Sequence, residues 1–506
     1  MPKKPSPVDV VVVGFGAAGI AAAITAHDEG ARVVVLEKME ERWAGGNTRA
    51  AGQVWYTPSS PELAKAYLRD LEQEMPVPDD VADAWAQEVC RNSAWIEARA
   101  EESIGHVEPV EGDDFTANDY VIDSFAEAVK RQTGWEVPNR DEFPEFNNEG
   151  GTDYIYFGGK QGNSRLWLRL RGALMSRGIE VRYSTAAQEL VTDKKGRVSG
   201  VRVSTPQGEQ VIEARRGVVL ACGGFENNPE MIRKYLGIPY ATPWGSPANT
   251  GDGIRMGQAL GADLQNMYQY MPFFGIRIPG EEVGEFIMPA GPAHIHVRKD
   301  GRRYLDETTP YSHGKSKIGG KYEYYPTPYA TWTVFDETVR TGPPLTMPRE
   351  AYPAGWLKLV KGYTWSEGSV EEIAKGWIAK ADTIRELAEK LGVDPDGLEA
   401  EVARYNAAAE QGEDPYFGRP GVAMAPIKEP PYYGYEWGNL IINTMGGLRK
   451  NGKAQVLRVS GDAIPGLYAA GEIASTYTWA LSGGQSIGDA ISFGRIAGRN
   501  AANGKG

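Results

Sequence analysis

Residues 9–38, with the sequence DVVVVGFGAAGIAAAITAHDEGARVVVLEK, decide the fold of the chain. The four valines at 10–13 are too short an apolar run for a free-standing helix, so they predict a buried strand that ends at a GxGxxG pattern. The residues that follow predict a helix over 20–28 and a second buried strand over 33–36. The stretch is therefore typical of one complete βαβ unit.

The glycines of this unit have separate physical roles. Gly14 permits a tight turn, Gly16 lets the backbone approach a pyrophosphate, and Gly19 lets the helix pack on the strand. The N-terminus of the helix then faces the phosphates. Glu37 follows the second strand, where its carboxylate can accept hydrogen bonds from the ribose of an adenosine without a 2′-phosphate. We predict a bound dinucleotide, and the alternative is a glycine-rich turn without a ligand.

Composition limits the class of protein. The chain has 506 residues, of which 41% are hydrophobic, as expected for a globular protein of two or three domains. Its net charge of -13 argues against a nucleic-acid partner. We expect no membrane span and a cytoplasmic location, because no apolar run has membrane-spanning length and no signal peptide is visible.

Cysteines and histidines predict no metal site. Cys90 and Cys222 are too few for a disulfide framework, a zinc site or an iron–sulfur cluster. His294 and His296 could share a strand face, but they lack acidic or thiol partners at ligand spacing. Electrons are therefore expected to pass through an organic cofactor.

The remaining segments are of two kinds: some have regular helix and strand patterns, and one is rich in aromatic residues, Pro and Gly. Residues 61–102 and 164–177 have helical patterns, and residues 179–221 alternate strands with turns before GVVLACGG returns the chain to a buried strand. Residues 261–437 are rich in Tyr, Trp, Pro and Gly, which indicates an inserted domain that closes with predicted helices over 370–391 and 397–411. From residue 441 onward, glycine-rich motifs like those of the first 60 residues occur again.

The glycine-rich motifs resemble those of a known family, the flavoproteins of the fumarate reductase, succinate dehydrogenase and 3-ketosteroid dehydrogenase group. The motifs occur in the order of that family over nearly the whole chain: GFGAAG with Glu37, GGNTRAAG, VVLACGGF, NTGDG, GRRYLDE, NTMGGL, LYAAGE and SGGQSIGDAISFGRIAG. The resemblance implies an α/β fold with a Rossmann-like FAD-binding domain of the glutathione-reductase type at 1–258 and 438–506. An inserted α+β substrate-capping domain is implied at 259–437.

The same resemblance implies FAD contacts by residues from several separate parts of the chain. They are Gly14, Gly16, Ala17, Ala18, Gly19, Glu37, Lys38, Gly45, Gly46, Asn47, Thr48, Ala51, Gly52, Ala187, Ala221, Gly223, Asp252, Glu472, Ser486 and Ile487. Members that hold FAD covalently have a histidine in the early glycine-rich region, and this chain has none there. We therefore expect noncovalent FAD.

The family moves a hydride and a proton across a C–C bond beside an electron-withdrawing group, and the proton needs its own acid or base. In the dicarboxylate-reducing branch an arginine after GxRFxxE donates the proton, and Tyr311 occupies the matching position here. The positions that clamp substrate carboxylates in that branch fall on uncharged residues, namely Met271, Phe286, Ile287, Asn443 and Leu481. Phe273 is also expected in this pocket. Because buried charges without partners are costly, a dicarboxylate substrate is disfavoured.

The ketosteroid branch uses a tyrosine near the position of Tyr311, so Tyr311 is the predicted proton-transfer residue. A phenol can accept a carbon-bound proton once it is ionised. The alternative for Tyr311 is a packing role, since tyrosines crowd this segment. A second tyrosine of that branch, near the end of the chain, falls near Ala480 here. We therefore expect the Ser482 hydroxyl and the Gly484 amide to bind the ketone oxygen. Tyr477 is a substitute candidate, and His313 could tune Tyr311.

These inferences predict an FAD-dependent ene-reductase or α,β-dehydrogenase that acts beside a ketone on a largely apolar substrate, cyclic ketones included. Only one GxGxxG pattern is present, so a separate electron donor or acceptor is expected. Two alternatives stay open. One is a fumarate reductase-like enzyme for an unsaturated carboxylate, and the other is a flavin-binding protein without turnover.

Overall fold

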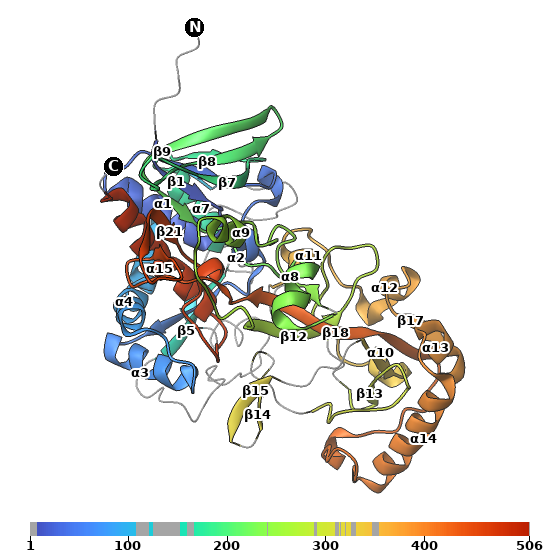
Figure 1. The fold of residues 1–506 in the computed structure, drawn as a ribbon. Coiled ribbons are helices and arrows are strands. Elements are labelled where there is room, and N and C mark those ends of the chain that lie inside the picture. The colour runs from blue at the N-terminus through green and yellow to red at the C-terminus, as the bar shows by residue number, and fades with distance from the viewer. Residues whose placement is uncertain are drawn as a thin grey trace.

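The structure is a computed structural model with two lobes (Figure 1). It describes residues 8–107, 121–124, 152–158, 166–239, 241–287, 291–308, 313, 315–318, 320–324, 330–346 and 354–504. One lobe contains the first and last elements of the chain, and the other contains the helices α10 (Glu337–Arg340), α12 (Val370–Ala374), α13 (Ile384–Leu391) and α14 (Pro395–Gln411).

The first lobe is built on an eight-stranded sheet in the order β20-β21-β9-β1-β2-β6, in which β8 also pairs with β9 and β7 pairs with β8. β1 is completely buried and pairs in parallel with β2 on one side and with β9 on the other. Burial on both faces explains why this strand consists almost entirely of valine. The strands are β1 (Val8–Val13), β2 (Val33–Leu36), β6 (Glu180–Arg182), β7 (Ala186–Thr192), β8 (Val198–Thr205), β9 (Gly208–Leu220), β20 (Gln455–Leu457) and β21 (Ala463–Ala469).

Helices surround this sheet. The predicted helical stretch 61–102 consists of three helices, and the predicted helix 164–177 is observed at Leu166–Met175. The helices of this lobe are α1 (Ala17–Asp28), α2 (Gly46–Ala50), α3 (Pro61–Glu72), α4 (Asp79–Val89), α5 (Asn92–Glu102), α7 (Leu166–Met175), α9 (Asp252–Ala259) and α15 (Gln485–Ala502).

The expected βαβ unit is confirmed, although α1 begins at Ala17 rather than at residue 20. The turn between β1 and α1 depends on two glycines. Gly14 has φ of +108°, and a Cβ added to Gly19 would lie 2.0 Å from the Gly14 carbonyl oxygen. The helix therefore starts directly at the end of the strand because no side chain separates the two backbones.

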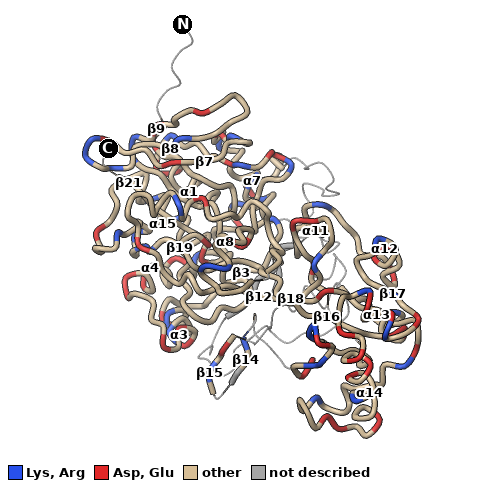
Figure 2. Tube along the Cα trace, turned by 45° about the vertical axis from the view of Figure 1, so that its right-hand side comes forward, with Lys and Arg blue, Asp and Glu red and all other residues tan. Residues whose placement is uncertain are grey.

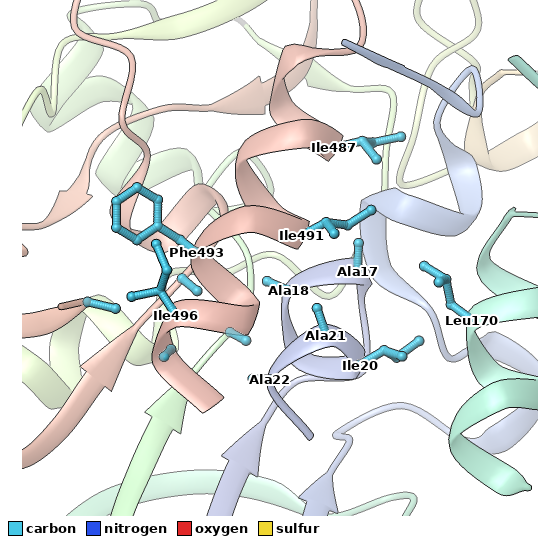
Figure 3. Packing of buried hydrophobic residues seen from close by; sticks show 14 of the residues in the cluster. Ala17, Ala18, Ile20, Ala21, Ala22, Leu170, Ile487, Ile491, Phe493 and Ile496 are labelled. Atoms are coloured by element: carbon cyan, nitrogen blue, oxygen red, sulfur yellow. The ribbon is translucent and has the colours of Figure 1, made fainter. Parts of the chain in front are cut away.

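The last helix packs closely against the first. A Cβ added to Gly494 would lie 2.6 Å from the Ala18 carbonyl oxygen, and one added to Gly498 would lie 2.3 Å from that of Ala22. Ile491 of α15 lies beside Ala17 and Ala18 of α1, whereas Ile496 and Phe493 lie on the other side of α15 (Figure 3). Small residues thus allow the two ends of the chain to meet.

A six-stranded sheet connects the first lobe to the second. Its order is β10-β18-β16-β13, and β12 and β17 also pair with β18. The strands are β10 (Thr242–Pro243), β12 (Tyr270–Ile276), β13 (His294–Val297), β16 (Thr331–Phe335), β17 (Ala379–Ala381) and β18 (Tyr432–Thr444). The predicted domain boundary between 437 and 438 falls inside β18. The division of the chain into domains therefore stays a prediction.

Smaller sheets of two or three strands complete the architecture. They are formed by β3 (Val54–Pro58), β4 (Val121–Ser124), β5 (Thr152–Gly158), β11 (Leu264–Gln265), β14 (Lys315–Ile318), β15 (Lys321–Tyr324) and β19 (Gly447–Leu448). β14 and β15 form an antiparallel hairpin that begins two residues after His313.

The prediction of one helix over 370–391 is wrong. The chain forms α12, then β17, then α13. Gly376 has φ of +75°, which ends the first helix, and Ala379–Ala381 then pair with β18. The predicted pair of packed helices is confirmed, because α13 buries Leu387 against Leu398 and Val402 of α14.

The contact between α1 and α15 gives a test of the fold. We expect Gly498→Ala to destabilise the protein by about 1–3 kcal/mol, since the added methyl group overpacks against the Ala22 carbonyl. Chemical denaturation measures the free energy of unfolding. Gly438→Ala is the matched control, because a Cβ there meets no atom within 4 Å. Equal stabilities of the two variants would contradict the close backbone approach.

Candidate functional site

A cavity lies where β1, β9 and β21 end and the six-stranded sheet begins. It encloses about 1550 Å³ of space, part of which is open to solvent. Its lining combines residues from early in the chain, such as Gly14 and Asn47, with residues from late in the chain, such as Glu472 and Ser486.

The cavity brings together the residues predicted to contact FAD. All of them line it except Gly19 and Gly45. Gly19 packs against Gly14, as described above. A Cβ added to Gly45 would lie 2.8 Å from the Trp167 ring, so this glycine permits packing of α7.

The glycine turn and α2 form one wall of the cavity. Gly14, Gly16 and Ala17 line this wall, and the Ala17 backbone N–H donates to Thr48 Oγ1 at 2.8 Å. This hydrogen bond ties the early glycine-rich segment to the N-terminus of α1. The arrangement matches the anion-binding geometry of helix N-termini.

Charged groups gather at the end of the cavity nearest β2. Burial raises the pKa of Glu37, which accepts a hydrogen bond from the Met39 backbone N–H at 2.8 Å. Lys38 Nζ donates to Asp252 Oδ2 and to Thr250 Oγ1, each at 2.8 Å. Arg255 Nη2 contacts the other oxygen of Asp252, so this carboxylate pairs with two cations beside the predicted ribose site.

A second pair of carboxyl groups occupies another wall. Glu472 lines the cavity, and Glu226 lies behind it with 2% of its surface exposed. Asn47 Nδ2 donates to both carboxyl groups, at 2.7 Å to Glu226 Oε1 and at 3.0 Å to Glu472 Oε1. Sequence reasoning missed Glu226, although it directly follows the GGF of a recognised motif.

The opposite end of the cavity is apolar. Met271 and Asn443 pair across β12 and β18 and both line the cavity, as predicted for substrate-pocket residues. Trp244 also lines it and stacks on Phe273 with ring centroids 5.8 Å apart. Phe286 packs on the same indole at 6.1 Å. No motif in the sequence pointed to Trp244.

Four of the six predicted pocket residues are absent from the described cavity lining: Phe273 and Phe286, which pack on Trp244, and Ile287 and Leu481. Ile287 is completely buried in the core of the second lobe, and Leu481 is buried in the core around α1 and α15. Neither residue is among those that line the cavity in the described part of the chain. Their apolar side chains fill hydrophobic cores, which explains their positions.

Of the five predicted catalytic residues, two line the cavity, two are buried outside its described lining, and one lies outside the described residues. Tyr311 lies outside the described residues. His313 and Gly484 line the cavity, and the His313 ring lies 6.0 Å from that of Phe273. Tyr477 instead packs edge-on against Trp85 at 5.9 Å, and the Ser482 backbone N–H donates to Gln485 Oε1 at 2.8 Å. Both are buried and absent from the described cavity lining.

The surroundings of both cysteines disfavour the thiolate form. Burial raises the pKa of Cys222, which lines the cavity, to about 12 and that of Cys90 to about 11. Both thiols therefore stay protonated at neutral pH. Within the described ranges, no three His, Cys, Asp or Glu side chains are grouped to hold a metal ion.

His294 and His296 have internal partners instead. His294 Nδ1 lies 2.6 Å from the Gly291 carbonyl oxygen, and His296 Nδ1 lies 3.0 Å from Thr333 Oγ1. The search for helices long and apolar enough to cross a bilayer, carried out over the described residues, found none.

Residues 9–487 match the model of the family described as FAD binding domain. The chain belongs to this family. It is an FAD-dependent oxidoreductase with a Rossmann-like α/β core.

Among its relatives, a 3-oxosteroid 1-dehydrogenase of Mycobacterium tuberculosis is 30% identical, and the match covers 97% of each chain. A fumarate reductase (cytochrome) of Shewanella frigidimarina is 26% identical over 98% of this chain and 77% of the relative.

Two solved structures have the same fold. A 3-ketosteroid Δ1-dehydrogenase from Sterolibacterium denitrificans superposes with a TM-score of 0.69 at 23% identity, and the match covers 98% of this chain and 99% of that one. The open form of a flavocytochrome c3 fumarate reductase gives a TM-score of 0.68 at 25% identity, and the match covers 99% of this chain and 79% of that one.

The residues of the cavity fit FAD. Gly14 and Gly16 leave space for close approach to a pyrophosphate, and Glu37 stands at the end of β2 for the ribose. Asn443 Oδ1 is buried without a hydrogen-bond partner among the described residues. Such an orphaned acceptor is satisfied when a ligand donates to it.

We expect acid precipitation of the purified protein to release its flavin into the supernatant, because no histidine occurs in the early glycine-rich segment. Absorbance of the supernatant and of the redissolved pellet measures the distribution. Yellow colour that stays with the pellet would contradict noncovalent binding.

Proposed function

We propose that the protein adds or removes a hydride and a proton across a C–C bond adjacent to a ketone, on a largely apolar substrate. The observation that carries this proposal is the uncharged, aromatic end of the cavity. The flavin supplies the hydride chemistry when bound. The protein must hold the substrate, exclude water and move the proton.

The charges around the cavity favour a ketone over a dicarboxylate. Among the lining residues that the structure describes, Lys38 is the one lysine or arginine, and it is paired with Asp252 at the end of the cavity nearest β2. Other charged residues gather on outer helices such as α3, α13 and α14 (Figure 2). A carboxylate in the apolar end would lose its hydration without gaining a cation, whereas a ketone needs only neutral donors.

Trp244 supports an apolar substrate in a second way. Its indole N–H donates to Glu285 Oε1 at 3.3 Å, and Phe286 N–H donates to the same oxygen at 2.9 Å. The indole is therefore held in place with its polar atom satisfied inside the protein. It offers the cavity an aromatic surface against which a carbon skeleton can pack.

We propose Tyr311 as the proton-transfer residue. Its sequence offset from GRRYLDE supports this role, and so do its neighbours. Four residues earlier, the Glu307 carboxylate is held by Arg303 at 2.6 Å and by Arg419 at 3.1 Å. Two residues later, His313 lines the cavity. We also propose that electrons are exchanged with a separate partner and that the protein acts in the cytoplasm.

The comparisons support two branches of the family. The relative at 30% identity is named for a 3-oxosteroid, and another relative is named a fumarate reductase. The uncharged cavity end favours the ketone branch. Reduction of an unsaturated carboxylate is the second candidate, and a flavin-binding protein without turnover is the third.

An anaerobic spectroscopic assay with matched compounds separates these candidates. We expect saturated cyclic ketones to bleach the flavin, or the corresponding enones to reoxidise the reduced flavin. Carboxylates with the same ring, and fumarate, should react at least ~100-fold more slowly, because desolvating an unpaired charge costs several kcal/mol. Faster reaction with the carboxylates would support the second candidate. A protein without turnover would respond to none of the compounds.

Tyr311→Phe tests the proton-transfer role. The change removes only the hydroxyl, so folding and FAD content should survive. We expect the flavin half-reaction with substrate to slow by ~10²–10⁴-fold, the usual contribution of general acid–base catalysis. Stopped-flow absorbance measures this rate. Tyr268→Phe, at an exposed tyrosine, is the control. A wild-type rate in Tyr311→Phe would remove this residue from the mechanism.

A further inference from the structure

Glu226 and Glu472 lie unusually close together for two acidic groups in a protein interior. One amide nitrogen, Asn47 Nδ2, is within hydrogen-bond distance of both, at 2.7 Å and 3.0 Å. Asn249 Nδ2 also reaches both, at 2.6 Å from Glu226 Oε1 and 3.4 Å from Glu472 Oε2. Two amides therefore bridge the pair.

The groups that face the pair from every surrounding element are neutral. Asn47 comes from α2, Asn249 from the loop before α9, and Thr444 and Asn443 from β18. No lysine, arginine or histidine of the described residues has a nitrogen within 4.0 Å of either carboxyl group. No cation in the described structure thus compensates two negative charges.

The physical environment opposes ionisation of both groups together. Burial raises the pKa of Glu226. Burial, and next the charge of Glu226, raise the pKa of Glu472 well above its ordinary value. Close carboxyl groups with this environment titrate as a pair, and one proton is retained far above the usual range.

An independent feature shows that this wall faces a ligand. Asn443, which lines the cavity with Glu472, donates from Nδ2 to Ser486 Oγ at 3.3 Å. Its Oδ1 is buried and has no partner in the described part of the chain. A hydroxyl or N–H group of a bound molecule is needed to satisfy this oxygen. The carboxyl pair therefore stands directly beside a ligand-binding position.

We propose that Glu226 and Glu472 share a single proton, and that Glu226 is a positioning residue for the FAD site. The shared proton keeps this wall at one negative charge. The remaining charge holds the amides of Asn47 and Asn249 in place. The proposal depends on FAD binding and is independent of the ketone chemistry.

The pH dependence of unfolding tests the shared proton. In the folded protein the pair keeps one proton above pH ~4.5, where the unfolded chain has released both. The folded state thus loses stability as pH rises, and the unfolding constant grows about tenfold per pH unit. In Glu226→Gln a neutral amide replaces the protonated acid, so this contribution disappears.

The experiment measures urea unfolding of the FAD-saturated full chain from pH 5.5 to 8.5, at a fixed excess of free FAD. Glu226→Gln, Glu472→Gln and the double variant are compared with the wild type. If the proton is shared, each single variant removes the whole pH slope of the pair and the double variant removes no more. The proposal is wrong if the reductions in pH slope caused by the two single variants add up in the double variant, or if the pH slopes do not change. Either single variant carries the test if the other fails to fold.

FAD affinity tests the positioning role. Glu226→Gln keeps a carbonyl acceptor for the Asn47 and Asn249 amides, and Glu226→Ala removes it. We expect the Kd for FAD to rise about tenfold more in the alanine variant, the usual effect of leaving a buried donor unpaired. Equal losses in both variants would show that Glu226 only fills space. Neither readout requires turnover, so failure of the ketone assay would leave this result intact.

Discussion

The close contact between α1 and α15 is the constraint on which the functional site depends. Gly494 and Gly498 allow the last helix to touch backbone atoms of the first. Because α15 begins at Gln485, this contact brings Gly484, Ser486 and Ile487 to the cavity formed by the N-terminal glycine turn. A chain of 506 residues thus completes its cofactor site only when its two ends have met.

Local rules explain what the sequence could predict. The βαβ unit, the glycine turns and the helix boundaries follow from patterns within about 30 residues. Glu226 was missed because its importance comes from a contact with Asn47, 179 residues away, and Trp244 was missed because it belongs to no motif. The helix expected over 370–391 failed for a related reason: pairing with β18 outweighed the local helical pattern.

Charged and uncharged side chains line different parts of the cavity. Lys38 and Asp252 meet at one end, the carboxyl pair with its amides forms a second wall, and Trp244 with Met271 forms the apolar end. The charged residues of the first two regions have partners within the protein. The predicted residues Ser482 and Tyr477 contribute to the core behind this site.

β18 has a consequence for how such enzymes can be recombined. This strand runs without interruption from Tyr432, beside β17 of the outer lobe, to Thr444 beside the carboxyl pair. It also pairs with β10 and β12, which come from much earlier in the chain. A chimaera that exchanged only the outer lobe with a relative would therefore cut through a shared sheet. An exchange of the outer lobe with a relative must therefore include β10, β12 and β18 together.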